Sequence, residues 1–471
     1  MQTVGRHLDR LTAVDASFLT NETSASHMHV GGILIFEGPP PLYVDLVEHV
    51  RSRLHLVPRF RQRLVTPPLE AGRPLWADDA NFNLTYHVRH TGLPEPGGEE
   101  QLKRLAGRVF SQRLDRSKPL WEMWLVEGLE DNRFALLTKT HHAMVDGISG
   151  VDIGTVLFDL EPNPQHAPSE NGWVPERTPN GAQLLARGAS EVAATPLKLV
   201  ERAVEAVRRP EHAARRIADA LEGLGELVGA LADPAPDVPL NQPIGPHRRY
   251  CWARSELATF KRIKNALGGT VNDVVLAVVA GALRNWLHSR SVRTEGLELR
   301  ALVPVSIRTE DERGDLGNRL AVMRGPLPVY VEDPVRRLRL VSEQMEGLKR
   351  SKQALGAEVI SRFNDFAPPT LLAQAARLNF STRLFNLIVT NVPGPQIPLY
   401  VLGRELREVF PVAFLPENHA LAVAIMSYNG RVDFGLLADY DSMEDVEEIA
   451  SGIARSLSEL EEAATAVSAA A

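Results

Sequence analysis

The chain has 471 residues, of which 44% are hydrophobic and 24% charged, as in most globular proteins. Its net charge of −7 and pI of about 6.1 exclude the basic surface that nucleic-acid binding requires. The single cysteine, Cys251, excludes an internal disulfide and favours a reducing, cytoplasmic compartment, where we expect a buried, inert thiol. No secretory signal and no apolar run of roughly 20 residues is seen, so any membrane contact is expected to be peripheral.

The N-terminal part alternates strand-like and helix-like patterns. We predict the following elements in chain order: a short turn with one inward aromatic side chain at 11–19, a buried strand at 29–36, a helix at 42–56, a strand at 84–88 and an amphipathic helix at 99–111. Five arginines gather in and after the first helix, at positions 51, 53, 59, 61 and 63. We interpret them as a solvated face; the alternative is a phosphate contact for a nucleotide-bearing substrate.

A predicted hairpin leads to the most unusual stretch of the sequence. An apolar strand at 120–126 turns at Gly128 and again at 131–132 into a second strand that begins at Phe134. That strand runs into Thr140-His141-His142-Ala143-Met144-Val145-Asp146-Gly147, and a helical pattern follows at 148–160. A strand end that opens into a turn is a place where a rigid scaffold can hold a side chain in a cleft.

The middle of the chain divides it. Prolines break residues 161–180, an Ala-, Glu-, Arg- and Leu-rich helical pattern covers 181–231, and five more prolines lie between 234 and 246. We therefore predict an N-terminal half at 1–165, a Pro-rich and helical linker at 166–245 and a C-terminal half at 246–471.

The C-terminal half restarts the mixture of strands and helices. A helix at 257–267 ends at Gly268-Gly269, and Thr270 with Asp273 three residues on predicts a capping box for the next, buried helix. The remaining predicted elements are strands at 248–254, 299–306, 320–331 and 387–390, mostly helix at 334–386, three strands at hairpin spacing at 409–414, 420–427 and 432–437, a final helix at 444–462 and a frayed tail from 464. The fold class is α/β, with mixed sheets in both halves.

The two histidines predict a division of labour. On a continuing strand, neighbouring side chains face opposite sides, so one imidazole can be buried and orient the segment while the other faces a cleft. Asp146 can carry a structural ion pair, and Gly147 leaves room for a ligand. A satisfied core histidine is the ordinary explanation for a lone His, but two adjacent ones followed by Asp-Gly favour function.

Other chemistries fit the stretch less well. Adjacent strand histidines diverge and no cysteine pair helps, so a metal site is disfavoured. The nucleophile turn of serine hydrolases has the sequence G-x-S-x-G, and Val151 occupies the position of its last glycine, so this class of enzyme is disfavoured. The remaining role is a general base, since an imidazole pKa of about 6.5 suits proton abstraction from an alcohol or amine.

His141 to Gly147 resembles the HHxxxDG motif of the acyltransferase superfamily that includes chloramphenicol acetyltransferase and peptide-synthetase condensation domains. Further segments resemble the bacterial wax ester synthase/diacylglycerol acyltransferase family in particular. They are 11–19 with Glu22, Pro119-Leu120-Trp121-Glu122, Asn272-Asp273, Pro304 to Arg308, Gly317-Asn318 and Asn391 to Pro395. The matches keep their order along the chain, and only residues 165–240, which look like the family's variable linker, lack a pattern.

The resemblance implies two chloramphenicol acetyltransferase-like halves with the active site in a tunnel between them. It also implies an O-acyltransferase that uses long-chain acyl-CoA as co-substrate, without a cofactor or metal, and esterifies diacylglycerol or a long-chain alcohol. Such an enzyme would work in the cytoplasm, either free or bound peripherally at the inner membrane face or at lipid bodies. His142 would be the base, supported by His141, Asp146 and Gly147.

Facing residues in the second half are open to two interpretations each. Asn272 is either the oxyanion donor or a supporting residue behind the site, Asp273 is expected to be a cap rather than a catalyst, and Arg308 either pairs with Asp146 or lies on the surface. Trp121 and Trp124 are expected in the core rather than in the wall of an acyl tunnel.

Two functional alternatives remain: a condensation-type acyltransferase with a carrier-bound donor, and a lipid-body surface protein without activity. The glycerolipid HxxxxD acyltransferases are a weaker match, because their downstream phosphate motif is not found.

The predicted pair of Asp146 and Arg308 can be tested directly. If the two side chains pair across the halves, Asp146→Ala leaves a buried, unpaired arginine and therefore a misfolded site rather than merely a slower one. Thermal unfolding and acyltransfer activity should then fall together. A variant with intact fold and activity would refute the pairing.

Overall fold

The computed structural model describes residues 8–68, 73–144, 157–164, 172–185, 233–306, 320–350 and 380–470. Three predicted site residues, Asp146, Gly147 and Arg308, lie outside these ranges, as does most of the predicted linker. The helices are α1 (Ala13–Asn21), α2 (Tyr43–Arg53), α3 (Leu84–His87), α4 (Glu99–Phe110), α8 (Leu257–Leu267), α9 (Val271–Ser289), α10 (Pro334–Arg350) and α13 (Val446–Ala470), with short 3₁₀ turns η1 (Leu54–Leu56), η2 (Pro58–Arg61), η4 (Glu130–Asn132) and η5 (His142–Met144).

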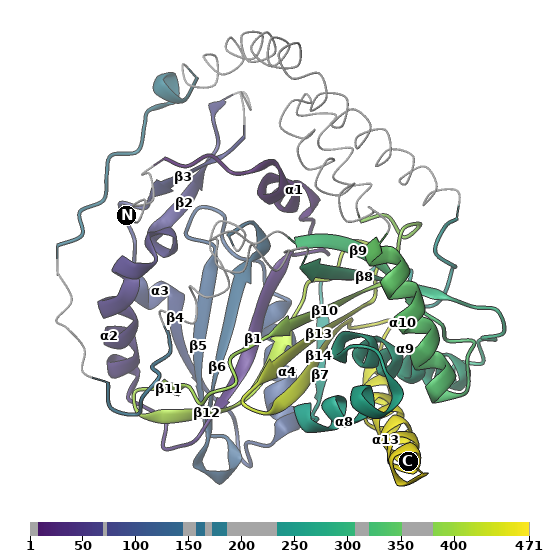
Figure 1. The fold of residues 1–471 in the computed structure, drawn as a ribbon. Helices are drawn as coiled ribbons and strands as arrows, with labels where there is room; N and C mark the ends of the chain where they lie inside the picture. The colour runs from purple at the N-terminus through teal and green to yellow at the C-terminus, as the bar shows by residue number, and fades with distance from the viewer. Residues whose placement is uncertain are drawn as a thin grey trace, which may run out of the picture.

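Two six-stranded mixed sheets form the body of the molecule (Figure 1). The first has the order β11 (Tyr400–Val401), β12 (Arg404–Val412), β1 (His29–Phe36), β6 (Phe134–His141), β5 (Trp121–Glu127), β4 (Val88–Gly92). The second has the order β7 (Arg248–Ala253), β14 (Arg431–Asp439), β13 (Leu421–Tyr428), β10 (Leu387–Pro393), β8 (Leu299–Ser306), β9 (Leu320–Leu327). A small ribbon of β2 (Gln62–Val65) and β3 (Leu75–Asp78) accompanies the first sheet. The α/β class with mixed sheets is confirmed.

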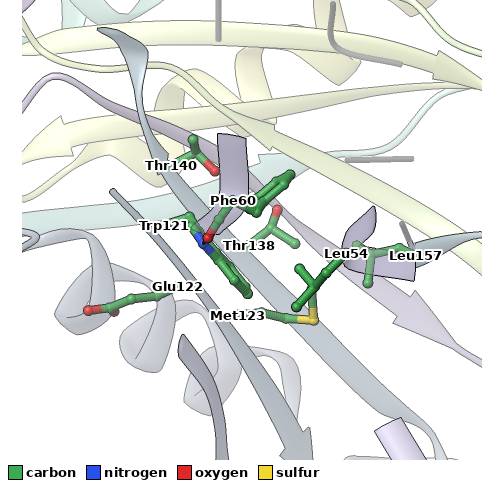
Figure 2. Close-up of a pocket in the computed structure, with 8 residues that line it drawn as sticks. All are labelled: Leu54, Phe60, Trp121, Glu122, Met123, Thr138, Thr140 and Leu157. Carbon is green, nitrogen blue, oxygen red and sulfur yellow. Dashed lines mark hydrogen bonds between the residues drawn. The ribbon is translucent and has the colours of Figure 1, made fainter. Parts of the chain in front are cut away.

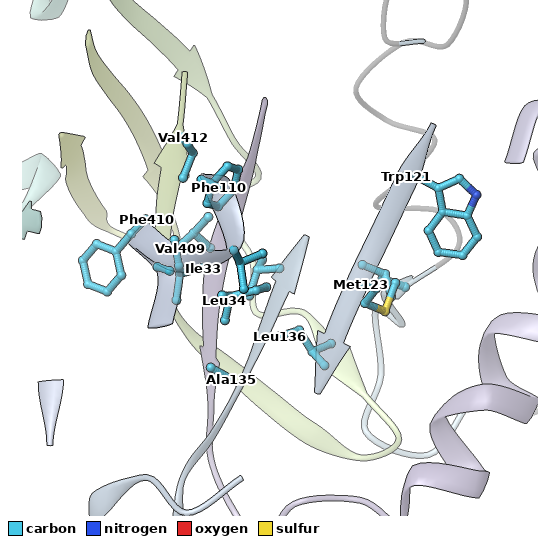
Figure 3. Packing of buried hydrophobic residues seen from close by; sticks show 14 of the residues in the cluster. Ile33, Leu34, Phe110, Trp121, Met123, Ala135, Leu136, Val409, Phe410 and Val412 are labelled. Carbon is cyan, nitrogen blue, oxygen red and sulfur yellow. The ribbon is translucent and has the colours of Figure 1, made fainter. Parts of the chain in front are cut away.

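The central strand of the first sheet, β6, is buried on both faces. Every residue of β6 is buried, and the strand lies at the centre of an apolar cluster that Ile33, Leu136 and Phe410 illustrate (Figure 3). Helix α4 covers one face of this sheet with Leu102, Leu105 and other apolar residues at helical spacing. Continuous burial explains why the sequence of β6 reads as an apolar run rather than as an alternating strand.

The second sheet is covered by helices α8, α9, α10 and α13 (Figure 1). Helix α9 is buried almost all round from Asp273 to Leu283 and begins with the predicted capping box. The Thr270 side chain accepts from the Asp273 N–H at 3.2 Å, and Asp273 Oδ2 accepts from the Thr270 N–H at 2.8 Å. Two of the orphan N–H groups at the helix start are thereby satisfied.

The C-terminal half contributes β11 and β12 to the first sheet. Strand β12 pairs antiparallel with β1 in the first sheet, although β10, which precedes β11 and β12 in the chain, and β13, which follows them, pair with each other in the second. Around this strand the sheets touch: the Tyr250 hydroxyl lies 3.0 Å from the carbonyl oxygens of Phe410 and Pro411. Arg254 adds ion pairs to Glu408 of β12 and to Glu99 of α4.

Several sequence predictions need correction. Residues 409–414 do not form a hairpin with β13, because β12 finds its partner in β1; the hairpin of β13 with β14 and its Asn429-Gly430 turn are confirmed. Residues 84–87 are helix α3 rather than strand, with Asn83 accepting from the Thr85 N–H as cap. The opening segment is helix α1 rather than a turn, and helix α13 continues through the predicted frayed tail to Ala470.

The arginine cluster is not a uniform solvated face. Arg53 and Arg61 are only 7% and 9% exposed. Arg53 pairs with Asp159, and the Arg61 guanidinium lies 4.5 Å above the Trp173 ring. These arginines therefore anchor Asp159 and Trp173 to α2 and η2, a role that requires tertiary contacts and cannot be read from spacing alone.

We predict that Gly435→Ala loosens the joint between the sheets. A Cβ at this position of β14 would lie 1.9 Å from the Pro411 carbonyl oxygen, which is backbone and cannot move aside. We expect the free energy of unfolding to fall by about 1–3 kcal/mol, measured by chemical denaturation. Gly347→Ala is the control, because a Cβ in that exposed part of α10 meets nothing within 4 Å; equal effects of the two substitutions would contradict the prediction.

Candidate active site

The histidine pair lies where β6 leaves the first sheet. His141 is the last residue of β6 and pairs with His29 of β1, and the His142 N–H donates to the Met28 carbonyl at 2.9 Å. The chain then turns at once into η5, so the strand does not continue through both histidines. His141 is fully buried and His142 is half-buried. His141 is thus more buried than His142, and the η5 turn rather than strand alternation separates them; that His142 faces a cleft stays a prediction.

An aromatic cluster surrounds the His142 ring. Phe18 of α1 stacks on it with ring centroids 4.0 Å apart, and Phe414, just after β12, meets it edge-on at 5.3 Å. Phe380 packs against both phenylalanines, at 6.1 and 5.6 Å. Chain segments nearly 400 residues apart thus meet at one imidazole. They give it an apolar environment in which the charged form is disfavoured.

His141 faces a buried carboxyl group. Its Nδ1 accepts from the Ala143 N–H at 3.1 Å, so the neutral ring carries its proton on Nε2. That Nε2 is buried, has no hydrogen-bond partner in the described part of the chain, and lies 3.8 Å from Glu22 Oε2. Glu22 is in turn paired with Arg116 and Arg113.

Burial sets the charge state of both rings. Desolvation lowers the pKa of His142 to about 4 and is also the largest cause that lowers the pKa of His141 to about 3; the charges of Arg116, His142 and Arg113 lower the latter further. Both imidazoles are therefore neutral near pH 7. Among the described residues, His142 Nδ1 is buried without a hydrogen-bond partner.

Asn272 and Asp273 lie in the first turn of α9. Asn272 Oδ1 accepts from the Asn391 Nδ2 at 3.4 Å, which joins two of the segments singled out in the sequence. Asp273 is buried; besides closing the capping box it accepts from the Ser342 hydroxyl at 3.3 Å. The predicted capping box is confirmed. A catalytic contribution of either residue stays a prediction, as do the roles of Asp146, Gly147 and Arg308.

The strand that carries the histidines also borders a small cavity on its other face. Figure 2 shows Thr138 and Thr140 of β6 with Trp121 and Met123 of β5 around it. Its volume is about 10 Å³, room for roughly one water molecule. Trp121 is 3% exposed and its Nε1 donates to the Phe60 carbonyl at 2.8 Å, as expected of a core residue.

Two further features bear on metal ions and membranes. Within the described ranges, no group of three or more His, Cys, Asp or Glu residues is arranged to hold a metal ion. In the same ranges no individual helix is both long enough and apolar enough to span a membrane. Helices α8 and α9 have the necessary length and apolar character only when taken together, and they are bent by 99° relative to each other.

Comparison with known proteins places the chain in a family. Residues 11–275 match the model of the wax ester synthase/diacylglycerol acyltransferase catalytic domain, and residues 316–461 match that of the C-terminal domain of the same family. The chain belongs to this family of acyltransferases. The resemblance noted in the sequence is thereby confirmed.

Individual relatives agree over nearly the whole length. The chain is 34% identical to a probable diacylglycerol O-acyltransferase of Mycobacterium tuberculosis over 450 residues, 95% of this chain and 94% of the relative. It is 31% identical over 472 residues to a second, putative diacylglycerol O-acyltransferase of the same organism, covering 96% of this chain and 90% of the relative.

Solved structures share the two-half architecture. The wax ester synthase/diacylglycerol acyltransferase of Marinobacter aquaeolei superposes with a TM-score of 0.70 at 28% identity, covering 97% of this chain and 100% of the other. The starter condensation domain of rhizomide synthetase superposes with a TM-score of 0.59 at 12% identity, covering 98% and 96%, which shows a common fold alone.

Sequence reasoning missed the residues that surround the pair. Glu22 was noted only as part of a family pattern, and Phe380 and Phe414 were not singled out. Phe18 was expected to point inward, and it is 8% exposed, but its partner was not foreseen. The one available signal was the spacing of Phe18 and Glu22, four residues apart and so on one face of a helix.

We predict a pH dependence of stability that originates at His142. As the pH falls from about 6.5 towards 4, the unfolded chain binds a proton at this ring and the folded chain does not, so stability present above pH 6.5 is lost through this window. Between pH 7.5 and 5.0 the unfolding free energy of the wild type should fall further than that of His142→Gln, by up to about 2 kcal/mol. Solvent screening of the partly exposed ring would reduce this difference. Urea denaturation at the two pH values measures this; equal losses would show that the folded ring titrates normally.

Proposed function

We propose that the protein transfers a long-chain acyl group from acyl-CoA to the hydroxyl of diacylglycerol, giving triacylglycerol, or of a long-chain alcohol, giving a wax ester. The observation that carries the proposal is a neutral His142 held between Phe18 and Phe414 at the end of β6. A neutral imidazole is ready to accept a proton at physiological pH, and its apolar surroundings suit two lipid substrates.

The proposed reaction proceeds in a ternary complex without an acyl-enzyme. His142 Nε2 takes the hydroxyl proton as the alcohol oxygen attacks the thioester carbonyl, and the tetrahedral intermediate collapses with cleavage of the C–S bond. The imidazolium then returns its proton to the CoA thiolate. Because an alcohol resembles water in acidity, with a pKa near 15.7, and a thiol has a pKa of about 8.5, activation of the alcohol is the demanding step.

Asn272 is our candidate for stabilising the oxyanion. Its Oδ1 accepts from Asn391, which orients the Nδ2 amide as a donor, and it lies in the first turn of a long helix, where the backbone dipole favours negative charge. Asp146, Gly147 and Arg308 belong to the proposed site through the family motif. No cofactor is part of the proposed reaction.

The acceptors are insoluble in water, so we propose that the enzyme works in the cytoplasm against a membrane or lipid-body surface. Diacylglycerol offered in vesicles rather than in detergent tests this aspect within the same assay.

We predict that His142→Ala lowers ester synthesis by about 10²- to 10⁴-fold, the usual contribution of a general base. The assay uses labelled palmitoyl-CoA with diacylglycerol, hexadecanol or monoacylglycerol, and the relative rates identify the acceptor. His419→Ala is the matched control, because His419 is also buried, stacks on Phe385 at 4.3 Å and has its pKa lowered to about 4 by burial, yet lies in the other half.

Two results would refute the proposal. One is a wild-type protein that makes no ester from free acyl-CoA, or makes it only from a carrier-bound donor. The other is a folded His142→Ala variant that is as active as the wild type.

A further inference from the structure

Helix α1 contacts both histidines of the motif. Phe18 in its last turn stacks on the His142 ring at 4.0 Å, and Glu22 at its C-cap places Oε2 at 3.8 Å from His141 Nε2. The Glu22 N–H donates to the Phe18 carbonyl at 3.1 Å, so one helical turn sets the spacing of the two contacts. Figure 1 shows α1 near the end of the first sheet at which β1 begins and β6 ends.

Glu22 is held in place by a built environment. Its side chain is only 1% exposed, and Arg116 Nε donates to Oε2 at 2.6 Å while Arg113 Nε reaches Oε1 at 3.4 Å. Arg116 also donates to the Leu19 carbonyl at 2.7 Å and so anchors the end of α1. A buried carboxylate is tolerated only with such partners, and here they fix its position behind the histidines.

The Glu22 carboxylate lies where it can favour one ring orientation and one protonated nitrogen of His141. Because Nδ1 of that ring accepts from the Ala143 N–H, the proton must be on Nε2, which points towards Glu22. With the ring turned over, Nε2 would no longer face an acceptor and the Ala143 N–H would lose its own. The orientation of His141 therefore supports the η5 turn, and this turn carries the His142 backbone.

We propose that Glu22 and Phe18 are positioning residues for the base, Glu22 acting through His141 and Phe18 directly on the His142 ring. This inference rests on the proposed function, because it presupposes that His142 accepts the proton. Neither residue takes up or releases a proton in the proposed reaction; their effect is to hold the imidazole in a geometry from which proton transfer is fast.

Glu22→Gln tests the first contact, because glutamine keeps the size and an acceptor oxygen for the arginines but removes the charge. We expect kcat to fall by about 10- to 100-fold, the usual loss when a reacting group is misplaced, with the KM of acyl-CoA and of the acceptor within about 2-fold of wild type. Glu99→Gln is the matched control, because Glu99 likewise pairs with an arginine, Arg254, but lies at the start of α4 and not at the histidines.

A double-mutant cycle separates this role from a purely structural one. If Glu22 acts through His141, adding Glu22→Gln to His141→Asn lowers kcat no further, whereas independent effects multiply. Wild-type kcat in Glu22→Gln, equal losses in Glu22→Gln and Glu99→Gln, or multiplying losses in the cycle would each overturn the role of Glu22.

Phe18→Leu tests the second contact and decides the proposal if Glu22→Gln does not fold. We expect a fall in kcat per folded enzyme of about 10-fold with unchanged KM values. Phe36→Leu is its control, since Phe36 stacks on Phe134 at 5.0 Å in the same sheet away from the site and should cost stability but not kcat. Equal kcat losses in the two variants would overturn the proposal.

These outcomes remain distinct from failure of the proposed function. Wild type and His142→Ala are assayed first with palmitoyl-CoA, and an inactive wild type or a fully active His142→Ala refutes the base itself. With the base established, only the Glu22 and Phe18 variants bear on positioning.

Discussion

The antiparallel pairing of β1 with β6 is the interaction on which the rest of the structure depends. Its register sets His29 opposite His141 and leaves the Met28 carbonyl to receive the His142 N–H. Gly31 permits this closeness, because a Cβ there would lie 1.8 Å from the Thr138 carbonyl oxygen. Displacing the ladder by one residue would turn β6 over and exchange its two faces, so the site has no tolerance for register error.

The faces of β6 have opposite chemical characters. Lys139, two residues before His141 and on the same side, is fully buried, with its ammonium 3.2 Å from Glu122 and bonded to the carbonyls of Val109 and Gln112. The alternate residues Thr138 and Thr140 border the small apolar cavity instead. A polar, paired layer thus lies on the side of β6 that carries His141, while the rings of Phe18 and Phe414 give His142 apolar surroundings, where charge is costly and a neutral base persists.

Much of this architecture could be predicted from local sequence. Apolar runs predicted β1 and β6, a Thr-x-x-Asp pattern predicted the start of α9, and Asn429-Gly430 predicted the last hairpin, because each depends on residues close together in the chain. Several failures share a cause: β12, the buried arginines and the ring cluster around His142 are decided by partners more than 100 residues away. Glu22 belongs with them, since a glutamate after a short helix gives no local sign that it will be buried against a histidine.

The contribution of β12 to the first sheet has a consequence for how the protein is made. Residues 31–36 pair with 406–412, so the first sheet remains incomplete until nearly nine-tenths of the chain has been synthesised. Until then the outer edge of β1 is an open row of unpaired backbone groups, the kind of edge that invites aggregation. Such distant pairing also raises the loop-closure cost of folding and slows it. The first sheet therefore cannot be completed before the C-terminal half has been made, and the N-terminal half produced alone would lack strand β12.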